Sequence, residues 1–193
     1  AFWQFIETSP RKLRDTITGV APAAATSALA SKLSPDFMGR IDYELELVIR
    51  IDRLGKGIAE KFASRYYTEV GLGIDFTARD MQQQAIQAGQ PWDLCKGFDN
   101  SAAISEFYPL TDFGTIDNLH FRLVINGQTV QEGYTGDMLF KPDYLISYIS
   151  QYYTLKIGDL LFTGTPQGVG QVKPGDRLQA YLEDKLLMDF EIK

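Results

Sequence analysis

Hydrophobic and polar positions alternate along several segments of the chain, a pattern typical of β-strands that bury one face. Every second position in residues 45–51 is leucine or isoleucine. Residues 119–125 repeat the alternation, and Asn126-Gly127 directly after them favours a tight hairpin turn. Residues 178–182 and 186–192 predict a further pair of strands near the end of the chain.

Apolar residues at helical spacing predict three helices, over residues 58–69, 77–88 and 142–153. In the second, Thr77 is placed to cap the first turn and Gly89 to end the helix, and the third begins with proline. The strand signals outnumber the helix signals, and the chain has no repeated strand–helix–strand unit. We therefore predict a mixed α+β fold that is mostly β.

The length and composition predict one main globular domain with a sizeable core, since the chain has 193 residues and 45% of them are hydrophobic. We expect residues 35–193 to form this domain and residues 1–34 to form an atypical N-terminal segment, because strand and turn signals become dense only after residue 34.

The charge and the cysteine content limit which partners and which cellular compartment we expect for the protein. A net charge of −6 and the lack of a basic run argue against nucleic acid as a partner. No stretch approaches the roughly 20 apolar residues that span a bilayer, so we expect no membrane association. A single cysteine, Cys95, forms no internal disulfide and indicates a reducing compartment, for which the cytoplasm fits best.

The polar face of the strand at residues 43–51 carries two carboxylates, Glu44 and Glu46. Alternation along a strand places both side chains on one face, opposite the leucines and isoleucines. Two like charges side by side indicate either a solvated strand face or a site with its own chemistry. The pair alone leaves both interpretations open.

A third carboxylate, Asp75, follows the small and apolar run 70–74 and is expected at the end of a buried strand. Asp75 is either a turn or capping residue, or a site residue placed near the first turn of the next helix. Arg79 and Gln82 lie three positions apart on that helix and share a face. That face is either solvated or able to hold an anionic group.

Two further segments carry candidate chemistry. Lys96 lies among Trp92, Cys95 and other apolar residues, and it is either a surface lysine or a partly desolvated group suited to proton transfer or to stabilising an enolate. The glycine-rich turn at 162–170 lacks the Gly-Lys-Ser/Thr sequence of a phosphate-binding loop. Its exposed amides and Thr165 are suited to holding a carboxylate.

Taken together, these motifs resemble the fumarylacetoacetate hydrolase family. The resemblance rests on residues 40–48, residues 73–82, Pro91-Trp92 with Lys96, and residues 162–170, whose order and spacing match over residues 35–193. It implies a β-roll or β-sandwich with a few short peripheral helices, and a homodimer. It also implies a divalent cation held by Glu44, Glu46 and Asp75. Three hard oxygen ligands favour Mg²⁺, Mn²⁺ or Ca²⁺ over zinc.

The resemblance further implies how a 2-oxo acid substrate is bound. The metal chelates neighbouring oxygens of a 2-oxo or β-diketo acid, and Lys96 lies beside the negative charge that develops on the enolate. Arg79 and Gln82 hold substrate oxygens, and Thr165 with Gly164 binds the substrate carboxylate. The implied reaction is C–C bond cleavage of an acylpyruvate or fumarylacetoacetate-type substrate by hydrolysis.

The sequence departs from the hydrolytic members of that family in one respect. Those members activate water with a histidine–glutamate pair near the N-terminus, whereas the only histidine here, His120, lies on a predicted strand and Glu7 has no histidine beside it. An oxaloacetate-type decarboxylase or a 2-hydroxy-diene-dioate isomerase needs the metal and an acid or base but no activated water. These activities, and a metal-binding homologue without activity, are the alternatives.

Overall fold

The computed structural model describes residues 39–193; the expectations for residues 1–34, including Glu7, lie outside these described residues. Strands hold more of the described chain than helices do. The strands are β1 (Ile41–Tyr43), β2 (Leu45–Arg50), β3 (Glu69–Asp75), β4 (Thr77–Ala78), β5 (Ala102–Ile104), β6 (Tyr108–Pro109), β7 (His120–Ile125), β8 (Gln128–Tyr134), β9 (Leu160–Phe162), β10 (Gly170–Gln171), β11 (Arg177–Leu182) and β12 (Lys185–Glu191). The helical segments are η2 (Glu60–Tyr66), α3 (Arg79–Ala88), α4 (Asp93–Lys96), η3 (Leu110–Asp112), η4 (Thr135–Asp137) and α5 (Pro142–Tyr152), where η marks a 3₁₀ helix.

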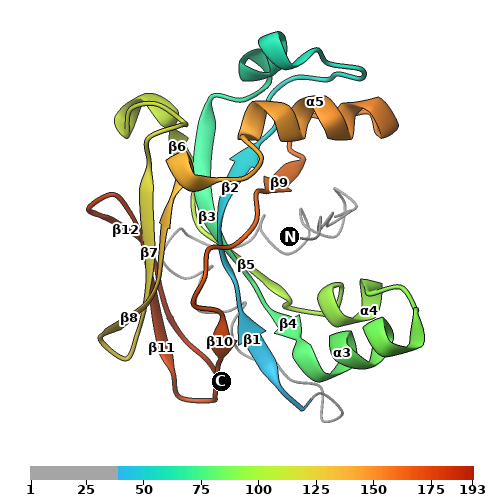
Figure 1. Cartoon of the computed structure of the whole chain (residues 1–193). Coiled ribbons are helices and arrows are strands. Elements are labelled where there is room, and N and C mark those ends of the chain that lie inside the picture. The colour runs from blue at the N-terminus through green and yellow to red at the C-terminus, as the bar shows by residue number, and fades with distance from the viewer. Residues whose placement is uncertain (1–38) are drawn as a thin grey trace.

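All the strand pairs within residues 39–193 are antiparallel, and they form three sheets. One sheet has the order β12-β11-β7-β8, a second has the order β5-β3-β2-β9 with β6 also paired to β3, and a small third sheet has the order β10-β1-β4. In Figure 1, α5 lies toward the upper end of β2 and β3, whereas α3 and α4 lie beside β1 and β4 at the lower end. The predicted α+β fold with a majority of strands is confirmed.

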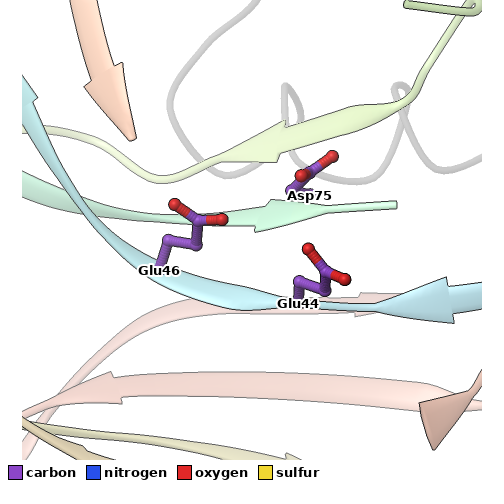
Figure 2. A group of neighbouring side chains, drawn as sticks. All are labelled: Glu44, Glu46 and Asp75. Carbon is purple, nitrogen blue, oxygen red and sulfur yellow. The ribbon is translucent and has the colours of Figure 1, made fainter. Parts of the chain in front are cut away.

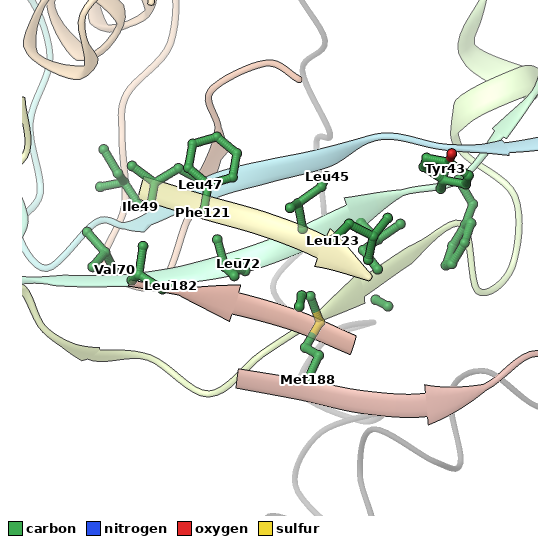
Figure 3. Close-up of a cluster of buried hydrophobic side chains, with 14 of the residues drawn as sticks. Tyr43, Leu45, Leu47, Ile49, Val70, Leu72, Phe121, Leu123, Leu182 and Met188 are labelled. Carbon is green, nitrogen blue, oxygen red and sulfur yellow. The ribbon is translucent and has the colours of Figure 1, made fainter. Parts of the chain in front are cut away.

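The main core lies between the two larger sheets. Figure 3 shows leucine, isoleucine and valine side chains of β2 and β3 facing apolar side chains of β7, β11 and β12. Leu45, Leu47 and Ile49 are fully buried, as the alternation in the sequence predicted. Burying such side chains stabilises the fold by roughly 1.5–3 kcal/mol each. This core fixes β2, the strand whose other face carries Glu46.

The predicted hairpins and the last predicted helix are confirmed. β7 and β8 meet at Asn126-Gly127, where both residues adopt positive φ angles of 51° and 81°. β11 and β12 form the second hairpin. α5 begins at Pro142 and ends one residue before the predicted end.

The other two predicted helices need correction. Over residues 58–69 the structure has only the 3₁₀ segment η2, because Tyr67 is extended and Glu69 already pairs with Arg50 on β2. In the second, Thr77 does not cap the helix. Thr77 instead belongs to β4 and pairs with Asp42 of β1, so pairing between strands overrides its capping preference. α3 starts at Arg79 and ends as predicted at Gly89, which has a φ of 61°.

No helix within residues 39–193 combines the length and the apolar composition needed to cross a membrane.

Candidate metal and substrate site

Three carboxylates converge where β1 passes into β2 and where β3 ends. Glu44 lies between the two strands, Glu46 lies on β2, and Asp75 is the last residue of β3. Figure 2 shows the three side chains gathered in one place, and one oxygen of each lies within 4.8 Å of the others. Glu46 and Asp75 are buried, with exposed fractions of 3% and 1%. The interpretation of Glu44 and Glu46 as a solvated strand face is therefore wrong for Glu46.

The register of β2 and β3 explains how a glutamate is accommodated inside the sheet. Gly73 lies directly opposite Glu46, and a side chain at Gly73 would overlap the ring of Phe162. The small residues before Asp75 thus leave room for Phe162 beside the carboxylates. Gly71 is needed for a different contact, because a side chain there would overlap the Ser105 hydroxyl and the Glu106 carbonyl.

Two cations contact the carboxylate cluster from α3 and α4. Lys96 donates hydrogen bonds through Nζ to Glu44 Oε2 at 2.9 Å and to Asp75 Oδ2 at 2.7 Å. Arg79 donates to Glu44 Oε1 at 2.6 Å and to Gln82 Oε1 at 2.6 Å. Lys96 is buried, so the interpretation of it as a surface lysine is wrong. Arg79 and Gln82 share a helix face, as predicted.

The negative charge of Glu46 is the least compensated in the cluster. Its carboxylate accepts a hydrogen bond from the Gly164 N–H at 2.6 Å, and within residues 39–193 it forms no ion pair. Burial, followed by the nearby charge of Asp75, raises the pKa of Glu46 to about 8. A divalent cation bound to the three acids would offset this excess negative charge. Three carboxylate oxygens are also the donor set that hard divalent cations prefer.

The glycine-rich turn after β9 lies against the same strand. Thr165 donates from its hydroxyl to the Leu45 carbonyl at 2.8 Å, and Gly164 adopts a φ of 96° that favours glycine. The Gly164 N–H points at Glu46, so it orients an acid of the cluster.

A cavity of about 700 Å³ joins these elements. Its walls are carboxylates and cations at one side and aromatic and aliphatic side chains such as Phe121, Ile149 and Phe162 at the other. It is lined by all the predicted site residues except Asp75, namely Glu44, Glu46, Arg79, Gln82, Lys96, Gly164 and Thr165. The structure therefore brings the predicted residues together around one space, with Asp75 buried behind it.

Two buried polar residues at this site were missed in the sequence. Asp42 is 2% exposed and accepts hydrogen bonds from Arg40 and Arg79, so it holds the Arg79 side chain. Its position two residues before Glu44 was a signal, because it continues the alternation of acids along the strand. Gln131 on β8 is also 2% exposed and contacts both β2 and the glycine-rich turn. The sequence gives no comparable signal for Gln131.

His120, the only histidine of the chain, does not line the cavity. It is exposed at the start of β7, where its ring stacks on Tyr134 with 4.5 Å between the ring centroids. This agrees with the expected structural role on a strand surface.

The arrangement suits chemistry on an oxygen-rich anion. The three acids could hold a cation, Lys96 and Arg79 provide positive charge and hydrogen-bond donors, and aromatic and aliphatic side chains form the other side of the cavity. Such a site favours reactions in which negative charge develops on a substrate oxygen.

Comparisons with known proteins agree with this description. The family model described as fumarylacetoacetate hydrolase C-terminal matches residues 8–191. The chain is 35% identical over 182 residues to a mitochondrial oxaloacetate tautomerase of Mus musculus, covering 94% of this chain and 82% of that protein. It is 38% identical over 161 residues to an oxaloacetate tautomerase of Escherichia coli strain K12, covering 82% of this chain and 74% of that protein.

A solved structure of similar fold shows a related protein with a metal and a small 2-oxo acid. The fumarylpyruvate hydrolase of Pseudomonas aeruginosa, in complex with Mn²⁺ and pyruvate, superposes with a TM-score of 0.76 at 31% identity. The alignment covers 83% of this chain and 70% of that one.

Proposed function

Because the chain belongs to the fumarylacetoacetate hydrolase family, we propose that it is a divalent-metal-dependent enzyme that interconverts the enol and keto forms of a 2-oxo diacid such as oxaloacetate. The observation that carries this proposal is the cavity that Glu44, Glu46, Lys96 and Arg79 line together, with the third acid, Asp75, buried beside the two glutamates. Two relatives that are more than a third identical to this chain are named as oxaloacetate tautomerases, which supports the proposal.

We assign the metal site to Glu44, Glu46 and Asp75 and expect Mg²⁺ or Mn²⁺, with Ca²⁺ as the alternative. The fit rests on the hard donor set and on the excess negative charge that raises the pKa of Glu46. The Mn²⁺ in the related fumarylpyruvate hydrolase supports a divalent cation as the metal of this chain. When bound, such a cation supplies Lewis acidity to the oxygen of a 2-oxo acid.

Lys96 is the residue that we assign to proton transfer. An ammonium group has three N–H donors, and the contacts with Glu44 and Asp75 use two of them, so one remains for the substrate. In the enol-to-keto direction, carbon 3 gains a proton and the enol oxygen loses one to solvent. Lys96 at the cavity wall would give the proton to carbon 3 and be charged again by exchange with water.

The other residues bind and orient the diacid. Arg79 and Gln82 are already hydrogen-bonded to each other and present one face of α3 to the cavity, where they would hold substrate oxygens. Thr165 and Gly164 would lie at the edge of the site for the second carboxylate of the substrate. The apolar wall beside Phe162 would exclude water while the proton moves.

Hydrolysis of an acylpyruvate is the second candidate, favoured by the structural similarity to a fumarylpyruvate hydrolase. This reaction needs a base that activates water. Within residues 39–193 the cavity is lined by carboxylates and a lysine and by no histidine. The proton-transfer reaction needs no activated water, so these residues suit it better than hydrolysis. Oxaloacetate decarboxylation likewise needs no activated water and remains an alternative.

One set of assays separates these candidates. Enol-oxaloacetate is added to the protein with Mg²⁺, and the decay of the enol absorbance is compared with that in Mg²⁺ alone and with the Lys96→Met variant. We expect acceleration by the wild type only. Parallel samples with acetylpyruvate and with keto-oxaloacetate report hydrolysis and decarboxylation. Turnover of acetylpyruvate without enol decay would replace the tautomerase proposal by the hydrolase, and no turnover of any substrate would indicate a metal-binding homologue without activity.

The homodimer and the cytoplasmic location stay predictions. Sedimentation of the purified protein tests the first. The relative from Mus musculus is named as mitochondrial, so microscopy of the tagged protein in its own cells is the direct test of the second.

A further inference from the structure

Strand β2 pairs with β9 along only half of its length, and this pairing ends at the position of the candidate site. β9 pairs with β2 only from Val48 to Arg50. After Phe162, the Thr163 N–H and hydroxyl both donate to the Leu47 carbonyl, at 3.2 and 2.9 Å, and the next two residues contact β2 through hydrogen bonds that involve side chains. At this point the Gly164 N–H donates to the Glu46 carboxylate instead of to a backbone carbonyl of β2.

Side chains replace the missing strand at Leu45, the residue between the two glutamates. Thr165 donates to the Leu45 carbonyl at 2.8 Å, and the side-chain oxygen of Gln131 accepts from the Leu45 N–H at 2.9 Å. The amide nitrogen of Gln131 donates to Thr165 Oγ1 at 2.9 Å and to the Pro166 carbonyl at 3.0 Å. The side-chain oxygen of Gln131 therefore bonds to the strand that carries Glu46, and its side-chain nitrogen bonds to the glycine-rich turn.

An irregularity in β8 directs Gln131 into this position. The register between β7 and β8 shifts after Leu123, so that Val130 is an extra residue and Gln131 lies opposite the fully buried Leu123. Bulges of this kind re-aim side chains. The far end of the turn is also held against β8, because Gly168, at a φ of 102°, leaves no space for a side chain beside the Val130 carbonyl.

We propose that Gln131 is a positioning residue that sets the distance between the strand of Glu44 and Glu46 and the turn of Gly164 and Thr165. The inference rests on the proposed function, since that turn is the expected site of the substrate carboxylate. Glu46 is also held by the pairing of β2 with β3, and the Glu44 carbonyl accepts a hydrogen bond from the Asp75 N–H. The turn is paired with strands only at its two ends, Phe162 with Val48 and Gly170 with Tyr43. Loss of Gln131 should therefore weaken binding of the oxo acid more than binding of the metal.

The test compares Gln131→Met with the wild type by titration calorimetry. Methionine keeps the length of the side chain and loses the acceptor and both donors. With Mn²⁺ alone we expect a dissociation constant within about threefold of the wild type, because the ligand acids stay on the paired strands. With saturating Mn²⁺ and pyruvate as the probe we expect binding about tenfold weaker, the size of one lost hydrogen bond. For any substrate that is turned over, KM should rise more than kcat falls.

The matched control is Gln128→Met, which makes the same change at an exposed position of the same strand and should alter neither constant. Gln131→Glu provides a second variant if Gln131→Met does not fold. It keeps an acceptor for the Leu45 N–H and loses the donors to Thr165 and Pro166. Its pyruvate binding should be weaker than that of the wild type, because an ionised glutamate cannot donate to Thr165 or to the Pro166 carbonyl.

Unchanged pyruvate binding in Gln131→Met would overturn the inference. A parallel loss of Mn²⁺ and pyruvate binding would overturn it as well, because that result indicates general disruption of the site. Wild-type protein that binds Mn²⁺ and pyruvate but turns over no substrate would refute the proposed function alone. Wild-type protein that fails to bind pyruvate in the presence of Mn²⁺ would refute the assignment of the turn and the role of Gln131 with it.

Discussion

The hairpin β11–β12 and the pair β2–β3 are both antiparallel, but they treat polar side chains differently. In β11 and β12, buried and exposed positions mostly alternate, and charged residues such as Arg177 and Asp189 lie on the exposed side. β2 and β3 are buried on both faces, so Glu46 and Asp75 are inside the protein. Alternation therefore indicates a strand in both regions, but only the burial of the second face distinguishes a solvated surface from a site.

The buried acids carry a free-energy cost that the exposed ones avoid. A buried carboxylate loses its hydration, and the cost is offset only by partners with good geometry. Lys96 and Arg79 supply such partners for Asp75 and Glu44, whereas Glu46 has a single backbone N–H donor in the described structure. The contrast between the two regions thus predicts how strongly each responds to the loss of a charge.

Replacement of Lys96 by methionine should have the largest effect. It removes the ammonium between Glu44 and Asp75 and leaves two acids, one of them 1% exposed, facing each other in the metal-free protein. Breaking a buried ion pair in this way costs about 3–5 kcal/mol. Urea unfolding in the presence of EDTA measures the loss. A decrease below about 1 kcal/mol would mean that the cluster is hydrated and behaves like the β11–β12 surface.

Replacement of Glu46 by glutamine should abolish tight metal binding and leave the fold intact. The amide keeps the shape of the side chain but removes one of three charged ligands, so we expect Mg²⁺ affinity to fall by about a hundredfold or more, equivalent to about 2.7 kcal/mol. Calorimetric titration with Mg²⁺ measures the change, and the far-ultraviolet circular dichroism spectrum checks the fold. Unchanged Mg²⁺ binding would refute the ligand assignment.

The same substitution should change how stability depends on pH. The pKa of Glu46 is raised to about 8, so between its ordinary pKa of 4.5 and pH 8 the folded protein binds a proton that the unfolded chain does not. Stability of the metal-free wild type should therefore fall as pH rises through this window. Because Glu46→Gln lacks the titrating group, its stability relative to the wild type should increase by about 3.5 kcal/mol from pH 5 to pH 8. Thermal unfolding in EDTA at both pH values provides the measurement, and a constant difference would show that the carboxyl is not protonated in the folded state.

Much of the fold and the site was predictable because it depends on local pattern. The alternation around Leu45 and Phe121 predicted strands with the correct buried faces, and the resemblance that the motifs carry implied that Glu44, Glu46, Lys96 and Thr165 would share one space. These features are encoded by residues close to one another in sequence or by motif spacing.

The failures come from contacts between distant segments. Thr77 has the side chain of a helix cap, but pairing with β1 places it in a strand. Gln131 joins the site through a bulge in β8 and through contacts with Leu45, which is 86 positions away. A single sequence reports residue types and local periodicity, and neither reveals a bulge or a side chain that replaces a missing strand.

The smallest effect is expected at the exposed ion pair of β11 and β12. Arg177 donates hydrogen bonds from Nε and Nη2 to the two oxygens of Asp189, both at 2.7 Å, and these bonds lower the pKa of Asp189. The arginine side chain is 62% exposed, so water and salt screen the attraction, and Arg177→Met should change the free energy of unfolding far less than Lys96→Met does. Because solvent screening is the cause, 0.5 M NaCl should shrink even this difference, whereas it should leave most of the loss in Lys96→Met. Urea unfolding of both variants at low and high salt makes the comparison, and an Arg177→Met loss as large and as salt-resistant as that of Lys96→Met would remove the distinction between the two regions.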